Sequence, residues 1–243
     1  MAIGNVTPDS FYEESRLINP SSKKTIEEAI IAWAQNALEE GADILDIGAC
    51  STRPGSTPVD EKEEWRRLEP AFRVLRQVLP QASLSLDTFR PEIARRALEQ
   101  FGPMIINDIS GGCEEMFDIV RAHDVPYVFT IRGNYDSLNV LDFTHDLNLI
   151  LDPGFGFCGG VEQDYECLRK MDQLKSYHRP VLVGISRKSM LWKPLGLSPD
   201  TCLSATQALH LYALEHGATI LRTHDVRATR EIIQLYEMIN VNE

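Results

Sequence analysis

LILDPGFGFCGG, at residues 149–160, joins an apolar run to an aspartate, a proline and a glycine-rich turn. The leucines and the isoleucine predict a buried strand, and the proline and glycines predict that this strand ends at Asp152. A carboxylate at the end of a buried strand is unfavourable unless it has a partner. We therefore expect Asp152 to face either a protein cation or a ligand that presents several N–H donors.

Short apolar runs like this one alternate with longer amphipathic segments from one end of the chain to the other. Strands are expected within residues 1–5, 42–48, 83–88, 104–112, 126–133, 149–152, 181–186 and 219–224. Helices are expected within residues 26–40, 62–79, 91–100, 114–123, 161–177, 199–216 and 227–239. Strands that alternate with helices are typical of a parallel sheet covered by helices. Eight such units in 243 residues predict an α/β fold, a (β/α)8 TIM barrel.

The fifth unit of this pattern is shorter than the others. Only residues 134–148 separate the fifth expected strand from the sixth, and their apolar positions allow two or three helical turns at most. The fifth helix is therefore expected to be short or missing.

Composition limits the other properties of the chain. With 43% hydrophobic residues and no linker-like boundary, residues 1–243 are expected to form a single domain. Five cysteines without metal-ligand spacing favour neither disulfides nor zinc and fit a reducing, cytoplasmic location. No apolar run reaches membrane-spanning length, and the net charge of −12 argues against nucleic-acid binding. Surface or helix-end positions are expected for His123, His145, His178, His210 and His216.

The expected strands end in polar residues almost without exception. In chain order these are Asn5, Asp46, Asp87, Asn107, Thr130 with Arg132, Asp152, Ser186 with Arg187 and Lys188, and Arg222 with His224. A single aspartate or asparagine of this kind is more often a helix cap than a catalyst, and Asp87, Asn107 and Asp225 are such candidates. In a barrel, however, all strand ends share the face that carries the active site. Carboxylates and amides on one wall with cations on the other suit a donor-rich heterocycle with an anionic tail.

Seven segments stand in order along the chain: NVTPDSF, STRPGS, LDTF, INDISGG, LDPGFGF, VLVGISRKSM and LRTHDV. In order and spacing they resemble the signatures of the dihydropteroate synthase family, the pterin-binding barrel enzymes that sulfonamides target. The resemblance extends over nearly the whole chain. It implies a transferase of folate biosynthesis. Such an enzyme condenses p-aminobenzoate with 6-hydroxymethyl-7,8-dihydropterin diphosphate and releases dihydropteroate and pyrophosphate. A homodimer is also implied.

The resemblance assigns the site residues to substrates. Five residues are implied to bind the pterin: Asp87, Asn107, Asp152, Lys188 and Arg222. Four are implied to bind the diphosphate: Asn5, Arg53, Arg222 and His224, with Asn5 also a ligand of the cofactor Mg²⁺. The implied p-aminobenzoate pocket consists of Phe11, Thr52, Pro54 and Ser186. The implied catalytic residues are Lys188, Arg222, Asp87 and Glu13, the last standing where the family usually has an aspartate.

Four departures from the family pattern leave alternatives open. TIRG stands where the family has His-Met-x-Gly, GACS where it has Gly-Gly-Glu-Ser, and Cys158-Gly159 where it has Gly-Lys, while the fifth helix is shortened. Because the pterin and diphosphate residues are present together, an active enzyme is the first hypothesis. A non-catalytic pterin-binding paralogue or partner subunit is the alternative that the short fifth unit favours. A methyltetrahydrofolate methyltransferase is a third hypothesis, but it gives no reason for STRPGS, SRKS or His224.

Overall fold

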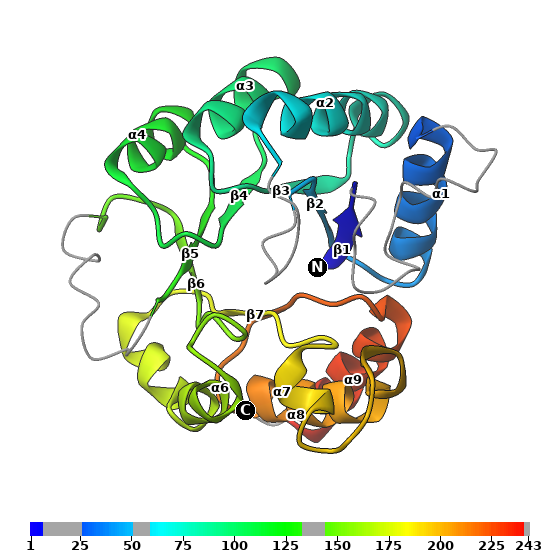
Figure 1. Ribbon diagram of the computed structural model, residues 1–243, viewed down its shortest axis with the longest axis vertical. Coiled ribbons are helices and arrows are strands. Elements are labelled where there is room, and N and C mark those ends of the chain that lie inside the picture. Colours follow the sequence, from blue (N-terminus) through cyan, green and yellow to red (C-terminus); the bar gives the residue numbers. More distant parts are fainter. Residues whose placement is uncertain (7–25, 51–58, 133–143, 241–243) are drawn as a thin grey trace.

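The computed structural model describes residues 1–6, 26–50, 59–132 and 144–240 of the chain (Figure 1). The described strands are β1 (Ala2–Asn5), β2 (Ile44–Gly48), β3 (Ser83–Asp87), β4 (Ile105–Asp108), β5 (Tyr127–Thr130), β6 (Leu149–Asp152), β7 (Leu182–Val183) and β8 (Ile220–Leu221). Each lies within the range that its apolar run predicts. All pairings between neighbouring strands are parallel.

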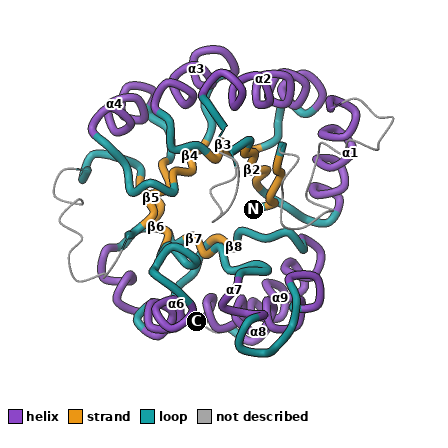
Figure 2. Tube along the Cα trace, in the orientation of Figure 1, coloured by secondary structure: helices purple, strands orange, loops and turns teal. Residues whose placement is uncertain are grey.

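The strands form a closed ring in sequence order, which confirms the predicted (β/α)8 barrel. β1 to β6 pair as one sheet, and β7 pairs with β8. Between β6 and β7, the Leu151 N–H donates to the Pro180 carbonyl oxygen at 2.8 Å. Between β8 and β1, the Ile3 N–H donates to the Thr223 carbonyl at 3.0 Å and the Thr223 N–H donates to the Met1 carbonyl at 3.0 Å. These bonds join the two sheets at both edges (Figure 2).

Helices surround the ring of strands on its outer side (Figure 2). The α-helices are α1 (Ile26–Glu39), α2 (Glu61–Val78), α3 (Pro91–Phe101), α4 (Glu114–His123), α6 (Val161–Arg169), α7 (Ser189–Trp192), α8 (Leu203–Glu215) and α9 (Val226–Ile239). Two 3-10 helices are η3 (Met171–Tyr177) and η4 (Pro199–Thr201). Local sequence explains several starts: the Asp60 side chain accepts the Glu63 N–H at 2.8 Å to cap α2, and Pro91 occupies the first turn of α3. No helix in the described ranges is both long and apolar enough to cross a membrane.

Two helix predictions differ from the structure. The helix expected at residues 161–177 is divided into α6 and η3, because the Lys170 N–H bonds to the Cys167 carbonyl, three residues back instead of four. The helix expected at residues 199–216 is divided into η4 and α8, and the sequence did not predict α7. The short or missing fifth helix was predicted for residues 134–148, most of which lie outside the described part of the chain.

The apolar core is divided by the barrel wall. Side chains alternate across each strand, so Leu45 and Ile47 of β2 pack outward against the helices while Ile44 points inward. An inner layer closes the barrel interior near the amino ends of the strands. It consists of Met1, Val128, Ile150 and Leu182, with Ile44, Ile105 and Ile220 packed against them. We call this layer the barrel floor.

Candidate active site

Polar side chains begin two residues beyond the floor on five of the strands. Because alternate residues share one face of a strand, the position after next again points inward. The five pairs of floor residue and polar residue are Ile44 and Asp46, Ile105 and Asn107, Val128 and Thr130, Ile150 and Asp152, and Ile220 and Arg222. The sequence therefore places an apolar floor below and a polar site above it, at the carboxyl ends of the strands.

Arg222 lies at the centre of this site and joins three strands. Its Nε donates to Asp46 Oδ2 at 2.7 Å, and its Nη2 donates to Asp87 Oδ2 at 2.7 Å. The Asn107 side chain donates to the same Asp46 oxygen at 3.1 Å. Burial alone would lower the pKa of Arg222, but attraction to Asp46 and Asp87 outweighs burial and raises this pKa above its ordinary value. Arg222 is therefore charged in the barrel interior.

Asp87 has an unusual protonation equilibrium. Burial raises the pKa of Asp87 to about 7, and nearby Asp46 and Asp108 act in the same direction, while Arg222 opposes them. The helix-cap interpretation does not apply to this carboxylate, because Arg90 is the residue before α3. Nor does it apply to Asn107, since Cys113 precedes α4. In the barrel interior, Asp87 instead accepts a hydrogen bond from Arg222, and Asn107 donates one to Asp46.

Asp152 and Lys188 lie on the opposite side of the barrel mouth. Asp152 Oδ1 accepts the Gly154 N–H at 2.8 Å, so the glycine turn folds back onto the strand end. Lys188 donates to the Phe155 carbonyl oxygen, and its Nζ lies 5.3 Å from the centroid of the Phe157 ring. Burial raises the pKa of Asp152 and lowers the pKa of Lys188, and the attraction between the two charges partly opposes both shifts. Lys188 is thus a protein cation near Asp152, and a protein cation is one of the two kinds of partner predicted for this carboxylate.

The turn after β6 requires glycine where it passes Lys188. Gly156 has φ +85°, and a Cβ at this position would lie 3.2 Å from Lys188 Cδ. Its N–H donates to Asp164 Oδ1 at 2.7 Å, which fixes the turn to the first residues of α6. Glycine is therefore favoured here by its positive φ, and a Cβ would also displace the lysine stem by a few tenths of an ångström.

Several buried polar atoms in the barrel interior have no hydrogen-bond partner among the described residues. They are Asp46 Oδ1, Ser85 Oγ, Asn107 Oδ1 and Thr130 Oγ1. Buried acceptors of this kind are normally satisfied by a ligand or by ordered water. Asp46 and Ser85 lie two positions below Asp87 in the strand register. Above them, Asn107 and Thr130 together with Asp87 and Asp152 make the barrel mouth rich in acceptors, which suits a flat ligand with several N–H donors.

The last two strands and the first one bring further predicted residues to the rim. Ser186 is buried after β7, and its hydroxyl oxygen accepts the His224 N–H at 3.2 Å. Asn5 ends β1, and His224 follows the neighbouring strand β8. These three residues lie at the same end of the barrel as Arg222, and a role in binding an anionic group stays a prediction.

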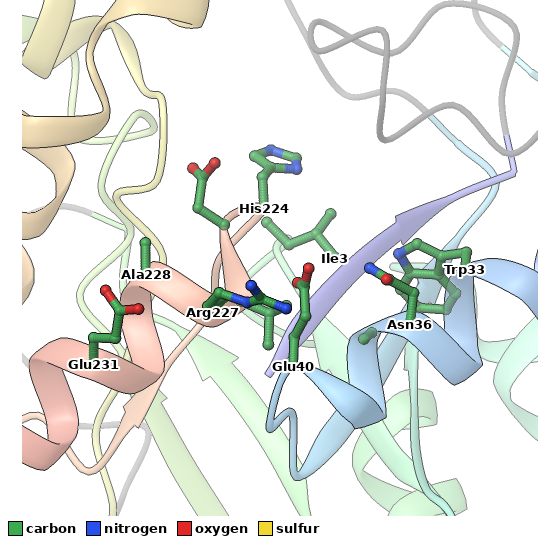
Figure 3. A pocket seen from close by; sticks show the side chains of 11 residues that line it. Ile3, Trp33, Asn36, Glu40, His224, Arg227, Ala228 and Glu231 are labelled. Atoms are coloured by element: carbon green, nitrogen blue, oxygen red, sulfur yellow. The ribbon is translucent and has the colours of Figure 1, made fainter.

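A pocket of about 380 Å³ lies beside this rim, between α1 and α9 (Figure 3). The pocket is lined by Trp33 and Asn36 of α1, by Glu40 just beyond that helix, and by Arg227 and Glu231 of α9. Of the predicted site residues that the structure describes, His224 lines it. The pocket is therefore adjacent to the Arg222 centre and distinct from it, and the acceptor-rich barrel mouth is the better candidate for the heterocycle.

Some predictions lie beyond the described residues, and two others need correction. Phe11, Glu13, Thr52, Arg53 and Pro54 belong to residues 7–25 and 51–58, which the structure does not describe. His210 was predicted at the surface or a helix end, but it is fully buried in α8 beside Thr229 of α9, and burial lowers its pKa to about 4. Asp46 appeared among the strand-end residues without a role, whereas the structure shows it holding Arg222. A polar residue at an inward position of an apolar strand was the signal for it.

Comparisons of this chain with known proteins all indicate the same family. A family model described as "Pterin binding enzyme" matches residues 1–139 and 141–224. The dihydropteroate synthase of Synechocystis sp. is 36% identical over 98% of this chain and 89% of its own length. That of Streptococcus pyogenes is 32% identical over 98% of this chain and 94% of its own length.

Solved structures show the same likeness in three dimensions. The Clostridium difficile dihydropteroate synthase, determined in the presence of pteroic acid, is 30% identical with a TM-score of 0.86 over 98% of this chain and 95% of that one. The Xanthomonas albilineans enzyme with 4-aminobenzoic acid is 33% identical with a TM-score of 0.83, covering 100% of this chain and 93% of that one.

Proposed function

Because this chain belongs to the dihydropteroate synthase family of pterin-binding enzymes, we propose that it condenses p-aminobenzoate with 6-hydroxymethyl-7,8-dihydropterin diphosphate. The products are dihydropteroate and pyrophosphate, in folate biosynthesis, and the enzyme class is a transferase. One observation carries this proposal most directly: Arg222 is buried between Asp46 and Asp87 in an acceptor-rich barrel mouth. Asp152 and Lys188 lie at the same mouth.

Pterin recognition follows from the chemistry of these residues. Asp152 accepts two N–H donors from the 2-amino edge of the ring, a paired geometry that is favourable in a site shielded from water. Asp87 and Asn107 contact the ring from the neighbouring strands, and Lys188 donates to its acceptor side. The planar guanidinium of Arg222 stacks on the ring and also faces the diphosphate, which the point charge of a lysine does less well.

The reaction needs electrostatic stabilisation more than a protein nucleophile. The bond between the exocyclic methylene carbon and the diphosphate oxygen breaks, and its electron pair leaves with pyrophosphate. Arg222, Arg53 and His224 stabilise the charge on this leaving group. The neutral amine of p-aminobenzoate then attacks the methylene cation, forms the C–N bond and releases a proton. In this proposal Ser186 contacts p-aminobenzoate together with Phe11, Thr52 and Pro54, and Glu13 helps to stabilise the cation.

The donor set at the first strand fits magnesium. Mg²⁺ prefers oxygen ligands, keeps several waters and binds phosphates with only one or two protein groups. The described residues contain no cluster of three His, Cys, Asp or Glu that would form a dedicated cage, while Asn5 offers a side-chain oxygen at the rim. When bound, the ion would neutralise charge on the departing pyrophosphate, and Asn5 would hold it.

The central test is pyrophosphate release by the purified protein. With both substrates and Mg²⁺, we expect one pyrophosphate for each dihydropteroate formed. Removing the metal with excess EDTA should lower the rate by roughly a hundredfold, since a bound cation stabilises the leaving charge by several kcal/mol. Adding Mg²⁺ back should restore the rate. A sulfonamide that competes with p-aminobenzoate serves as the control for turnover at this site.

Other outcomes of this assay would support the alternative functions. Absence of turnover together with calorimetric binding of the pterin diphosphate would favour a non-catalytic pterin-binding paralogue or partner subunit. Methyl transfer from methyltetrahydrofolate, without pyrophosphate release, would favour the methyltransferase. Absence of both turnover and pterin binding would contradict the assignment to this site.

We also propose that the protein is a cytoplasmic homodimer, each chain a single domain. Support for dimerisation comes from exposed apolar residues on α9: Leu235, Met238 and Ile239 are 53%, 71% and 71% exposed. Exposed apolar groups gathered on one helix are typical of a protein interface. The five cysteines are free, as expected of a protein in a reducing compartment.

Light scattering at micromolar concentration should give twice the mass of one chain. Met238→Asp should shift the mass towards that of a monomer, because a buried unpaired charge opposes association. Val78→Asp is the matched control, since Val78 is 43% exposed at the end of α2, on another side of the barrel. A monomeric mass for the unmodified protein would contradict the dimer.

A further inference from the structure

Asp46 is a buried charge that the proposed reaction does not use. It is the third residue of β2 and has no exposed surface. Its Oδ2 accepts two hydrogen bonds, from Arg222 Nε at 2.7 Å and from the Asn107 side chain at 3.1 Å. Its Oδ1 is buried and has no partner among the described residues. Burying a carboxylate this deeply disfavours folding unless an opposite charge and hydrogen bonds compensate for the lost hydration.

Two carboxylates each accept one hydrogen bond from the guanidinium of Arg222. Nε binds Asp46 and Nη2 binds Asp87, each at 2.7 Å. The two acceptors lie on neighbouring strands at different heights, since Gly48, two residues beyond Asp46, is level with Asp87. Asp46 is therefore the deeper anchor, and Asp87 lies nearer the open mouth.

Ligand binding should affect the two contacts differently. Under the proposed function, Asp87 accepts hydrogen bonds from the pterin, and these compete with its bond to Arg222. Asp46 is completely buried and lies below the ring, so its bond to Nε is not open to the same competition. Without Asp46, Arg222 would lose its remaining fixed contact when the ligand engages Asp87.

We propose that Asp46 is a positioning residue that anchors Nε of Arg222, so that the guanidinium stays aimed at the pterin and diphosphate after Asp87 binds the ligand. The inference rests on the proposed function for its consequence in catalysis, while the anchoring itself is a property of the free protein. Asn107 supports the anchor by donating to the same oxygen of Asp46.

Steady-state kinetics of Asp46→Asn test the catalytic consequence. The asparagine keeps the size and one acceptor but removes the charge, so we expect kcat to fall by about ten- to a hundredfold, the usual range for losing a charged contact to a group that acts in the transition state. KM for p-aminobenzoate should change less than about twofold, because Asp46 does not contact that substrate. Asp46→Leu should show a fall at least as large. Leucine is included because it removes both acceptors as well as the charge, while Arg222 keeps Asp87 as a partner in the free protein.

Ser85→Ala is the matched control. Ser85 pairs directly with Asp46 in the β2–β3 register, is fully buried and has an unpartnered hydroxyl. The Ser85→Ala substitution should leave both kcat and KM unchanged. If Asp46→Asn and Asp46→Leu are folded and retain full kcat, Asp46 has only a structural role and the proposal is wrong.

A spectroscopic measurement separates this inference from the proposed function. In protein labelled with ¹⁵N-arginine, the Nε–H of Arg222, assigned by its loss in Arg222→Lys, should exchange slowly with solvent. It should exchange rapidly in Asp46→Leu, which has no acceptor, and stay slow in Ser85→Ala. This result would support the anchor even if the unmodified protein had no turnover, which would overturn only the proposed reaction. Rapid exchange in the unmodified protein would overturn the anchor whatever the activity.

The pH dependence of pterin binding reports the balance of charges around Arg222. The charged groups that face Asp87 are Arg222, Asp46, Asp108 and Lys188. Removing the negative charge of Asp46 should move the inflection for Asp87 to lower pH, because one like charge is lost and Arg222 is left to Asp87 alone. Ser85→Ala, which removes no charge, should leave the inflection where it is.

Discussion

Replacing Lys188 with alanine is expected to lower kcat/KM for the pterin diphosphate by roughly a thousandfold, since losing one member of a shielded charge pair typically removes several kcal/mol. Lys188 donates to the Phe155 carbonyl, lies beside the Phe157 ring and opposes the charge of Asp152. Its removal takes away the donor for the pterin and leaves Asp152 without its nearest cation. The measurement is initial-rate kinetics with the pterin diphosphate varied and p-aminobenzoate saturating.

Lys193→Ala is the control for this substitution. Lys193 lies in the same segment and is exposed, with its Nζ 5.6 Å from the Trp192 ring. It should leave kcat/KM within about twofold of the unmodified protein, as expected of a surface substitution. Asp152→Asn should resemble Lys188→Ala, and the double variant should be little worse than either one, because residues that act as a unit are not additive. Turnover of Lys188→Ala within tenfold of the unmodified protein would remove Lys188 from the pterin site.

Pterin affinity is expected to fall as the pH falls through about 7. Burial raises the pKa of Asp87 from 3.8 to about 7, so below this pH the group is neutral and accepts N–H donors poorly. Affinity should then fall by up to tenfold for each pH unit, since one proton must leave before the ligand binds. Calorimetry with 6-hydroxymethylpterin, which lacks the titrating diphosphate, isolates this effect between about pH 5.5 and about pH 7.5, where the pterin ring stays neutral.

Asp87→Asn provides the control for this pH dependence, and it also tests how Asp87 affects the stability of the fold. Binding to this variant should be weak and without an inflection near pH 7. Between the unfolded pKa of 3.8 and the folded pKa of about 7, the folded protein holds a proton that the unfolded chain has released. Asp87 therefore lowers stability as the pH rises through this window, and the loss is complete above it. Asp87→Asn should unfold at a higher temperature than the unmodified protein at pH 8, but not at pH 4.

The sequence predicted the barrel because its expected strands and helices alternate so regularly. A strand has only two faces, so an apolar residue followed two positions later by a polar one already specifies a floor and a site above it. Asp87, Asn107, Asp152 and Arg222 were placed correctly at one mouth on this basis. Their roles towards substrates stay predictions.

Other features depended on contacts between distant parts of the chain. Asp46 and Arg222 are 176 residues apart, and no spacing rule indicates that one carboxylate binds Nε while the next binds Nη2. His210 seemed polar enough for the surface, but the packing of α9 on α8 buries it. The division of the helix at Lys170 coincides with three-residue backbone bonds made by the N–H groups of Lys170 and Gln173, which local propensity does not predict.

The barrel floor and the charges above it imply a compromise between stability and activity. Arg222, Asp46 and Asp87 lie in an interior that an all-apolar sequence could fill, and apolar replacements of buried ion pairs are often neutral or stabilising. A barrel selected for stability alone would extend the floor upward and lose the site. The protein retains the charged centre in spite of its unfavourable burial, and the floor beneath it supplies apolar packing that helps the fold to tolerate that centre.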